Sequence, residues 1–201
     1  MQDFRAIPIP EETDPPYSET LQFLRDTLET LLISIVMFVV INAVSARIRV
    51  DGYSMMPTLE SGEFIVVNRL SYRLGQPERG DIIVFHYPHN PTQEYIKRII
   101  GLPGDKIRIA DGLVYVNGYP LEEPYIAAPP QYQTEMTVGE AQLFVLGDNR
   151  NNSSDSHVWG TVPFDYVIGK ATFVYWPLPR AGFLNHDDMA LAAPVSSPQH
   201  P

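Results

Sequence analysis

Two residues of the chain have side chains that could cleave a peptide bond together. Ser54 lies in the run Gly52-Tyr-Ser-Met-Met-Pro-Thr-Leu59, and Lys97 lies in the run Tyr95-Ile-Lys-Arg-Ile-Ile100. A serine hydroxyl is a weak nucleophile and needs an adjacent base. A lysine amine can be that base when burial lowers its pKa, because a medium of low dielectric disfavours the ammonium form. The apolar residues on both sides of Lys97 favour such a setting.

The turn around Ser54 and a polar run later in the chain supply the expected surroundings of this pair. Gly52 and Pro57 indicate a turn, which could expose the Ser54 hydroxyl and point backbone N–H groups at a reacting carbonyl. The run Gly147-Asp-Asn-Arg-Asn-Asn-Ser-Ser-Asp-Ser-His157 is dense in short hydrogen-bonding side chains. It is interpreted either as a loop of Asx turns or as a layer of partners that fixes the direction of the Lys97 amine.

The size and composition of the chain exclude several classes of protein. Its 201 residues, 44% of them hydrophobic, suit one folded domain with appendages. Charged residues make up only 19% and the net charge is -10, so nucleic acid is not expected as a partner. The chain has no cysteine, which excludes disulfides and thiolate chemistry but leaves the compartment open.

The N-terminal part of the sequence predicts a membrane anchor. Residues 1–20 are acidic and proline-rich, which indicates a disordered or extended segment. The chain then carries no charge from Thr30 to Ala46, and this stretch is close to the lower limit of about 17 residues for a spanning helix. Charged residues just before it can lie among lipid headgroups, so we expect a transmembrane helix over residues 21–46.

Two other interpretations of this segment were weighed. A buried helix of a soluble domain is disfavoured because the segment is apolar on every face. A cleaved secretory signal is disfavoured because the region before it is long and acidic, where a short basic one is expected. Basic residues occur on both sides of the segment, so local charge does not determine its orientation in a membrane.

After residue 47 the pattern predicts a mainly β fold. Short β-branched or aromatic runs are bounded by Gly, Pro, Asn or Asp, and no helical periodicity of comparable length follows. The predicted strands are 64–68, 81–85, 94–100, 143–146 and 167–176, with a hairpin over 106–118 that turns at Asp111-Gly112. We therefore expect a β domain over 47–177 with an irregular polar insertion at 120–142, followed by a flexible tail over 178–201.

Four runs, in this order and spacing, resemble the type I signal peptidases, also called leader peptidases. They are Ser54–Leu59, Gly80–Phe85, Lys97–Asp105 and Gly147–Ser156. That family consists of membrane-bound serine proteases that remove signal peptides from exported proteins, and the resemblance covers roughly residues 25–177. It implies a signal-peptidase-like fold of antiparallel β-sheets, preceded by one N-terminal transmembrane helix.

The resemblance assigns roles to residues of this chain. Ser54 would be the nucleophile and Lys97 the general base of a serine–lysine dyad, and Ser153 would orient the lysine amine. The implied loop-bracing residues are Asp148, Arg150, Asp155 and Arg98. The implied pockets for small substrate residues, one and three places before the cut, are lined by Val50, Met55, Leu59, Tyr95 and Ile96.

The resemblance also implies the reaction and its location. The enzyme would cut exported preproteins after small-x-small sites through an acyl-enzyme, with no metal and no cofactor. Its partners would be signal peptides and the lipid bilayer, and it would act in protein secretion as a monomer. It would cross the plasma membrane, or another energy-transducing membrane, once, with the catalytic domain on the extracytoplasmic face.

The sequence departs from the family pattern at two positions. Some members have a serine that helps to hold the oxyanion where this chain has Gly52, which leaves the Ser54 N–H as the expected donor. Some members have an arginine where this chain has His157, which weakens the positive partner expected for Asp155. Such a partner matters because a carboxylate close to Lys97 would favour the ammonium form.

Three alternatives remain open at this point. A serine–histidine enzyme or a metal site could use His86 and His89, but no hydrolase or zinc motif surrounds them. A self-cleaving repressor would share the serine–lysine chemistry, yet the apolar segment 30–46 and the lack of a DNA-binding module argue against it. A membrane-anchored β domain that binds extended peptides without cleaving them would keep the same motifs.

Overall fold

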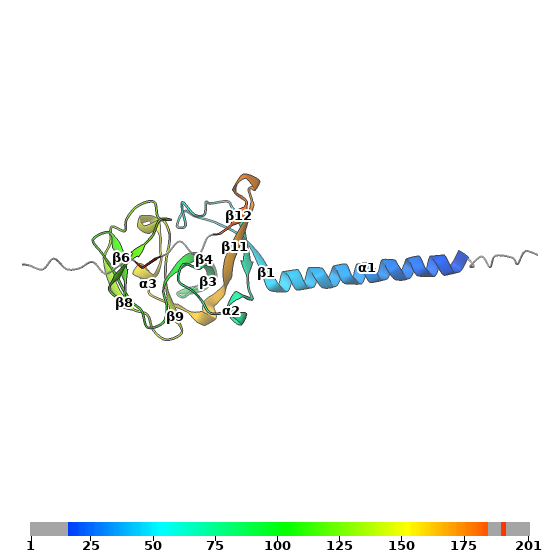
Figure 1. Cartoon of the computed structure of the whole chain (residues 1–201), viewed down its shortest axis with the longest axis horizontal. Helices are drawn as coiled ribbons and strands as arrows, with labels where there is room; N and C mark the ends of the chain where they lie inside the picture. Colours follow the sequence, from blue (N-terminus) through cyan, green and yellow to red (C-terminus); the bar gives the residue numbers. More distant parts are fainter. Residues whose placement is uncertain (1–15, 185–189, 192–201) are drawn as a thin grey trace, which may run out of the picture. The chain divides into compact units, whose positions relative to one another are not determined.

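The computed structural model of the chain describes residues 16–184 and 190–191 (Figure 1). These residues belong to two compact units that divide after Asn42. The predicted disorder of residues 1–15 and most of the predicted flexible tail lie outside the described residues.

The first unit is dominated by helix α1, Pro16–Val44. It begins before the expected start at residue 21 and includes residues 16–20, which the composition indicated as disordered or extended. A proline is well tolerated in the first turn of a helix, where its missing N–H has no partner to lose. At its other end the helix stops before Ser45 and Ala46, which pair with the next strand instead.

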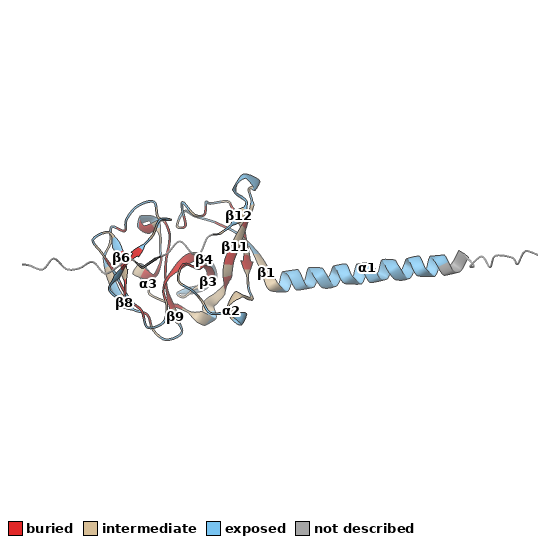
Figure 2. Cartoon of the chain, viewed as in Figure 1, coloured by how far each residue is buried: buried red, intermediate tan, exposed pale blue. Residues whose placement is uncertain are grey.

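Helix α1 is long and apolar enough to cross a membrane. An 18-residue stretch within Glu19–Val44 has a mean hydropathy of 2.2, and none of that stretch is buried in the structure (Figure 2). Three of its hydroxyl groups are satisfied within the helix: Thr27, Thr30 and Ser34 each donate to the carbonyl four residues earlier, at 2.7–2.8 Å. Such bonding suits a helix in hydrocarbon, where no water is present to accept these hydrogens.

A large antiparallel sheet forms most of the second unit (Figure 1). Its strand order is β1-β2-β11-β3-β4-β9-β10, and β12 adds to β11. The strands are β1 Ser45–Arg49, β2 Phe64–Asn68, β3 Ile82–Tyr87, β4 Asn90–Gly101, β9 Gln142–Leu146, β10 Val162–Pro163, β11 Val167–Trp176 and β12 Gly182–Phe183.

A smaller antiparallel sheet has the order β13-β7-β6-β5-β8. Its strands are β5 Lys106–Ala110, β6 Leu113–Val116, β7 Tyr119–Glu122, β8 Thr134–Thr137 and β13 Ala190–Leu191. The predicted turn at Asp111-Gly112 is present, and both residues have positive φ, as the tight hairpin turns require. Because β7 and β8 overlap residues 120–142, that segment is less irregular than we expected.

The mainly β class is confirmed. Within the described residues after 47, the helices are single turns: α2 Ser71–Leu74, α3 Ser156–Trp159, and the 3-10 turns η1 Arg150–Asn152, η2 Phe164–Tyr166 and η3 Leu178–Arg180. The expected tail is partly structured, since η3 and β12 follow residue 177 and β12 pairs with β11.

Strand β3 is buried on both faces and separates two parts of the core. Ile82 and Val84 point to a cluster that includes Met55 and Leu59 from the turn after β1. Ile83 and Phe85 point to the opposite cluster, which also holds the end of α3 through its Trp159. A third cluster, packed around Ile107, Val114, Val116 and Phe144, joins the small sheet to β9.

Candidate active site

The turn that carries Ser54 is fixed to the large sheet at both ends. The Val50 N–H donates to the Glu63 carbonyl at 2.7 Å, and the Gly62 N–H donates to the Val50 carbonyl at 2.8 Å. Gly52 has φ +104°, a conformation that side chains rarely adopt. The turn therefore holds the Ser54 hydroxyl at a defined position.

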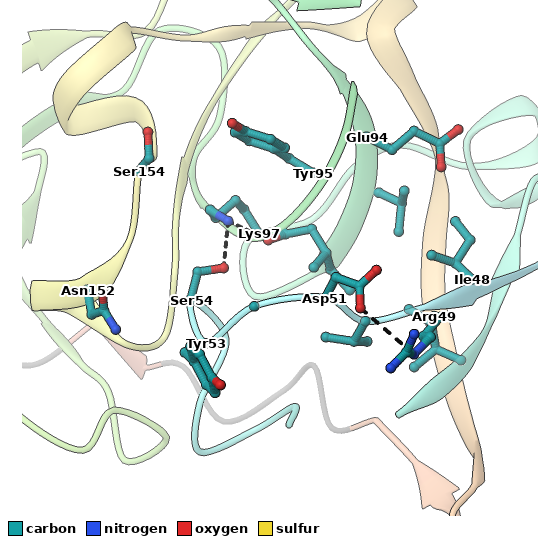
Figure 3. Close-up of a pocket in the computed structure, with 15 residues that line it drawn as sticks. Ile48, Arg49, Asp51, Tyr53, Ser54, Glu94, Tyr95, Lys97, Asn152 and Ser154 are labelled. Carbon is teal, nitrogen blue, oxygen red and sulfur yellow. Dashed lines mark hydrogen bonds and ion pairs between the residues drawn. The ribbon is translucent and has the colours of Figure 1, made fainter. Parts of the chain in front are cut away.

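Lys97 reaches this hydroxyl from β4. Its Nζ lies 2.8 Å from Ser54 Oγ and 2.9 Å from the Ile96 carbonyl oxygen (Figure 3). The side chain is buried, with 4% of its surface exposed. The structure thus brings together the two residues that the sequence singled out, which are 43 positions apart along the chain.

Burial lowers the pKa of Lys97 from 10.5 to about 8, although Asp155 and Asp148 act in the opposite direction. An amine with a pKa near 8 is partly neutral in mildly alkaline solution. Its lone pair can then accept the Ser54 proton while an N–H still donates to the Ile96 carbonyl. The arrangement is that of a nucleophile with an adjacent base.

The run of residues 147–157, which we call the catalytic loop, packs directly against the serine turn. The Asn149 N–H donates to the Ser54 carbonyl at 3.0 Å, and its side-chain amide donates to the Tyr53 carbonyl at 3.1 Å. A Cβ atom at Gly147 would lie 2.4 Å from the Ser54 carbonyl oxygen, so a larger residue does not fit there. The loop therefore restrains the backbone at Tyr53 and Ser54.

A buried ion pair joins the catalytic loop to β4. Arg98 donates to Asp148 through Nε at 2.9 Å and Nη2 at 2.7 Å, and it also donates to the Gly80 carbonyl at 3.0 Å. Thr58, from the serine turn, donates to the same carboxylate. Removing one partner of a buried pair leaves an uncompensated charge, which costs about 3–5 kcal/mol.

Sequence reasoning missed two residues that contact this network. Glu123 accepts from both terminal nitrogens of Arg150, at 2.5 and 2.6 Å, and the Tyr125 hydroxyl donates to Glu123 at 2.7 Å. The Tyr125 ring also lies 4.0 Å from the guanidinium carbon of Arg98. Both residues belong to the segment that we interpreted as an irregular insertion, where no local pattern separates a buried carboxylate from a solvated one.

Asp155 is buried beside the dyad and does not bond to Lys97. It accepts from the Gly147 N–H at 2.9 Å, and its other oxygen lies 2.6 Å from His157 Nδ1. Its ionisable partner is therefore the histidine that stands where some family members have arginine.

Ser153 lies close to the dyad without the contact that the resemblance implies. Its hydroxyl is buried and has no hydrogen-bond partner among the described residues, while Lys97 bonds to Ser54 and Ile96 instead. The orienting role of Ser153 therefore stays a prediction.

A cavity of about 450 Å³ opens beside the dyad (Figure 3). Its walls come from the end of β1 with the serine turn, from β4, and from the catalytic loop. The lining residues are 48–54, Ile65, Val84, 94–97, Asn152 and Ser154.

Three of the five expected pocket residues, Val50, Tyr95 and Ile96, line this cavity. Met55 and Leu59 are not among its lining residues, so their place in the substrate pockets stays a prediction. They are 1% and 0% exposed and pack in the core cluster under the turn. These two apolar side chains anchor the turn to the core.

Donors for an oxyanion are limited at this site. Within the described residues the Ser54 N–H makes no hydrogen bond, whereas the Gly52 N–H donates to the Ser61 hydroxyl at 3.2 Å. The same part of the chain holds no group of three or more His, Asp or Glu side chains arranged to bind a metal.

Comparison with known proteins finds similarity over nearly the same residues as the resemblance described above, which covers roughly 25–177. A family model described as signal peptidase, peptidase S26, matches residues 24–176. The chain is 44% identical over 182 residues to a probable signal peptidase I-2 of Synechocystis sp., covering 85% of this chain and 81% of that protein. A signal peptidase I of Leptolyngbya laminosa is 44% identical over 170 residues, covering 80% and 84%. One from Bacillus caldolyticus is 43% identical over 149 residues, covering 67% and 81%.

Proposed function

The chain belongs to the signal peptidase family, peptidase S26, and we propose that it removes signal peptides from exported preproteins through a Ser54–Lys97 dyad. The observation that carries this proposal is the 2.8 Å contact between Lys97 Nζ and Ser54 Oγ in a buried setting. Membership in the family makes the chain a serine peptidase. The dyad assigns the chemistry to two atoms.

The reaction would run in two halves. Neutral Lys97 takes the Ser54 proton as the serine oxygen attacks the scissile carbonyl, and the Ser54 N–H donates to the oxygen that becomes negative. Lys97 then gives its proton to the leaving amine, which departs as the mature protein and leaves an acyl-enzyme. In the second half Lys97 removes a proton from water as the water oxygen attacks the ester. Lys97 then returns this proton to Ser54 Oγ as the ester C–O bond breaks, and the signal peptide leaves with a free carboxyl group.

The substrate would bind in extended form along β4. This strand pairs with β9 only from Arg98 onward, so residues 90–97 have no strand partner on that side within the described chain. Part of this free edge, residues 94–97, lines the cavity and leads to Lys97. An extended peptide can add to such an edge by main-chain hydrogen bonds, while alternate side chains enter pockets.

The cavity walls favour small side chains near the cut. Val50, Ile96 and Val84 are apolar and lie close to the dyad, and the Tyr95 ring lies 5.3 Å from Lys97 Nζ. Pockets of this kind admit an alanine more readily than a branched or aromatic residue. We therefore propose that the enzyme cuts after small-x-small sites.

Helix α1 would anchor the enzyme in the membrane that its substrates cross. The helix is long and apolar enough to span it once. Exported preproteins present their cleavage sites on the far side of that membrane, so the second unit would face the extracytoplasmic compartment of a plasma membrane or another energy-transducing membrane. Preproteins and lipid are then the proposed partners.

The test is processing of a preprotein with a small-x-small site by the full chain in detergent. We expect Ser54→Ala and Lys97→Met to lose cleavage to background while the thermal unfolding transition persists, and the wild-type rate to rise with pH through about 8. Matched controls are Ser71→Ala in α2 and Lys106→Met, an exposed lysine of β5, which should cut at the wild-type rate. Full activity in either dyad variant would refute the assignment.

A further inference from the structure

Residues 123–132, which lie between β7 and β8 and which we call the strap, contact two arginines near the site. Its Glu123 accepts from both terminal nitrogens of Arg150, and its Tyr125 ring packs against the guanidinium of Arg98. Neither contact involves the nucleophile or the base directly. Arg98 follows Lys97 in β4, and Arg150 donates to the Gly147 carbonyl in the catalytic loop.

The strap is also tied to the catalytic loop by a pair of amide contacts. The Gln131 N–H donates to Asn151 Oδ1 at 2.8 Å, and Asn151 Nδ2 donates to the Pro129 carbonyl at 2.9 Å. One asparagine of the loop therefore holds the strap backbone on both sides of residue 130. The next strap residue, Tyr132, is placed by this anchor.

Tyr132 stacks on a ring of the catalytic loop. Its ring centroid lies 3.7 Å from that of His157, with 13° between the planes. The Tyr132 hydroxyl is buried and has no hydrogen-bond partner among the described residues. Tyr132 therefore acts here through its ring face, which stacks on the His157 imidazole and fixes the plane of that ring.

The imidazole in turn holds Asp155. His157 Nδ1 lies 2.6 Å from one Asp155 oxygen, and the other oxygen accepts from the Gly147 N–H. The second carboxylate near the base, Asp148, is already occupied by Arg98 and Thr58. Of the two carboxylates, Asp155 is the one whose partner depends on a packed ring.

We propose that Tyr132 is a positioning residue: by stacking on His157 it keeps the imidazole on Asp155, and so sets the pH range in which Lys97 acts as base. This inference rests on the proposed dyad chemistry.

The direction of the effect follows from the groups around each side chain. Lys97 is faced by Asp148, Asp155, the Ser54 hydroxyl and the Tyr95 ring, and His157 is faced by Asp155 and Tyr132. When the imidazole moves away, Asp155 loses a donor and its negative charge acts on Lys97 with less compensation. The lysine pKa then rises, and a smaller fraction of the amine is neutral near pH 7.

The experiment measures the rate of preprotein cleavage against pH for the full chain in detergent. The acid limb is the part of the pH–rate profile in which the rate rises as the base loses its proton. In Tyr132→Ala and in Tyr132→Leu, which keeps most of the side-chain volume, we expect this limb to shift to higher pH by about half a pH unit or more. The rate near neutral pH would fall about threefold and recover in alkali. Tyr132→Phe keeps the ring face and should keep the wild-type limb.

A double variant tests the route through the histidine. His157→Gln should shift the limb in the same direction as Tyr132→Leu. If the tyrosine acts through the imidazole, the double variant shifts it no further, whereas independent effects would add. Additive shifts would overturn the proposed route.

A matched control separates this role from a general loss of packing. Tyr115 of β6 stacks on Arg108 at 4.2 Å in the small sheet, so Tyr115→Ala removes a similar contact and should leave the limb in place. A folded Tyr132→Leu enzyme whose rate falls equally at every pH would overturn the proposal. That outcome leaves the dyad intact, since the dyad fails only if Ser54→Ala or Lys97→Met still cuts.

Discussion

Burial of the Lys97 amine affects the stability of the protein as well as its chemistry. Its pKa in the folded protein is about 8, below its ordinary value of 10.5. Below pH 8 folding must bury a charged ammonium, and the cost is fully present. Between pH 8 and 10.5 the unfolded chain binds more protons than the folded one, so this group makes stability rise with pH over that window.

Lys97→Met is therefore expected to be inactive and more stable than the wild type at pH 7. The gain in the free energy of unfolding would be at most about 3 kcal/mol, the equivalent of the pKa difference, less the value of the lost hydrogen bonds. Urea unfolding at pH 7 and pH 10.5 measures it, and the gain should shrink at the higher pH. Lys106→Met, in which an exposed lysine is replaced, should change neither value; an equal loss of stability at both pH values in Lys97→Met would contradict the argument.

The contact between Ser54 and Lys97 could be predicted because motif and environment agree. A lysine between apolar strand residues and a serine between glycine and proline are both unusual, and the structure places them in contact. The contacts of Glu123, Tyr125 and Tyr132 could not be predicted, since they depend on where a polar segment folds back. The burial of Met55 and Leu59 was missed because a turn has no periodicity from which side-chain direction follows.

Among the elements, the strands with sharp sequence boundaries were predicted best. The predicted runs 64–68 and 167–176 coincide with β2 and β11, since both are β-branched or aromatic and end at breakers. Strand β4 begins at Asn90, four residues before the expected start, in a polar stretch that pairs with β3 near their common turn. Such an extension follows from the neighbouring strand and not from its own composition.

Ile96 of β4 provides a test of the proposed specificity at the level of this strand. It lines the cavity beside the dyad. Ile96→Ala removes the three side-chain carbon atoms beyond Cβ and would enlarge the pocket by about their volume. Preproteins with valine or leucine at the small positions should then be cut more readily, and their disadvantage against alanine should fall about tenfold or more. The ratio of kcat/KM values for matched preproteins measures this change.

Ile109→Ala is the matched control for this variant. Ile109 is buried in the small sheet and does not line the cavity, so its loss should lower stability and leave the ratio unchanged. An unchanged ratio in Ile96→Ala would show that another wall selects the substrate.

The whole molecule combines a β unit that has its own core with a helix whose apolar side chains are exposed. If α1 crosses a bilayer, two lysines near its middle should weaken its insertion, at a cost of about 2.5–3.5 kcal/mol for each charge. We expect the wild-type chain to stay in the membrane pellet after alkaline carbonate washing and the double variant Val36→Lys, Val40→Lys to be released. Leu74→Lys, at an exposed position of α2, should stay with the pellet. Retention of the double variant would argue against a spanning helix.

Strand β3 links two core clusters of the second unit, because each face of the strand belongs to one of them. One face of the strand supports the cluster under the serine turn, and the other supports the cluster that includes Trp159 at the end of α3. Detaching either cluster uncovers the same strand, and local openings of a protein follow such shared units. Hydroxyl and amine should therefore lose their alignment in a single cooperative event, so that a partly opened molecule is an inert one and cannot cut indiscriminately.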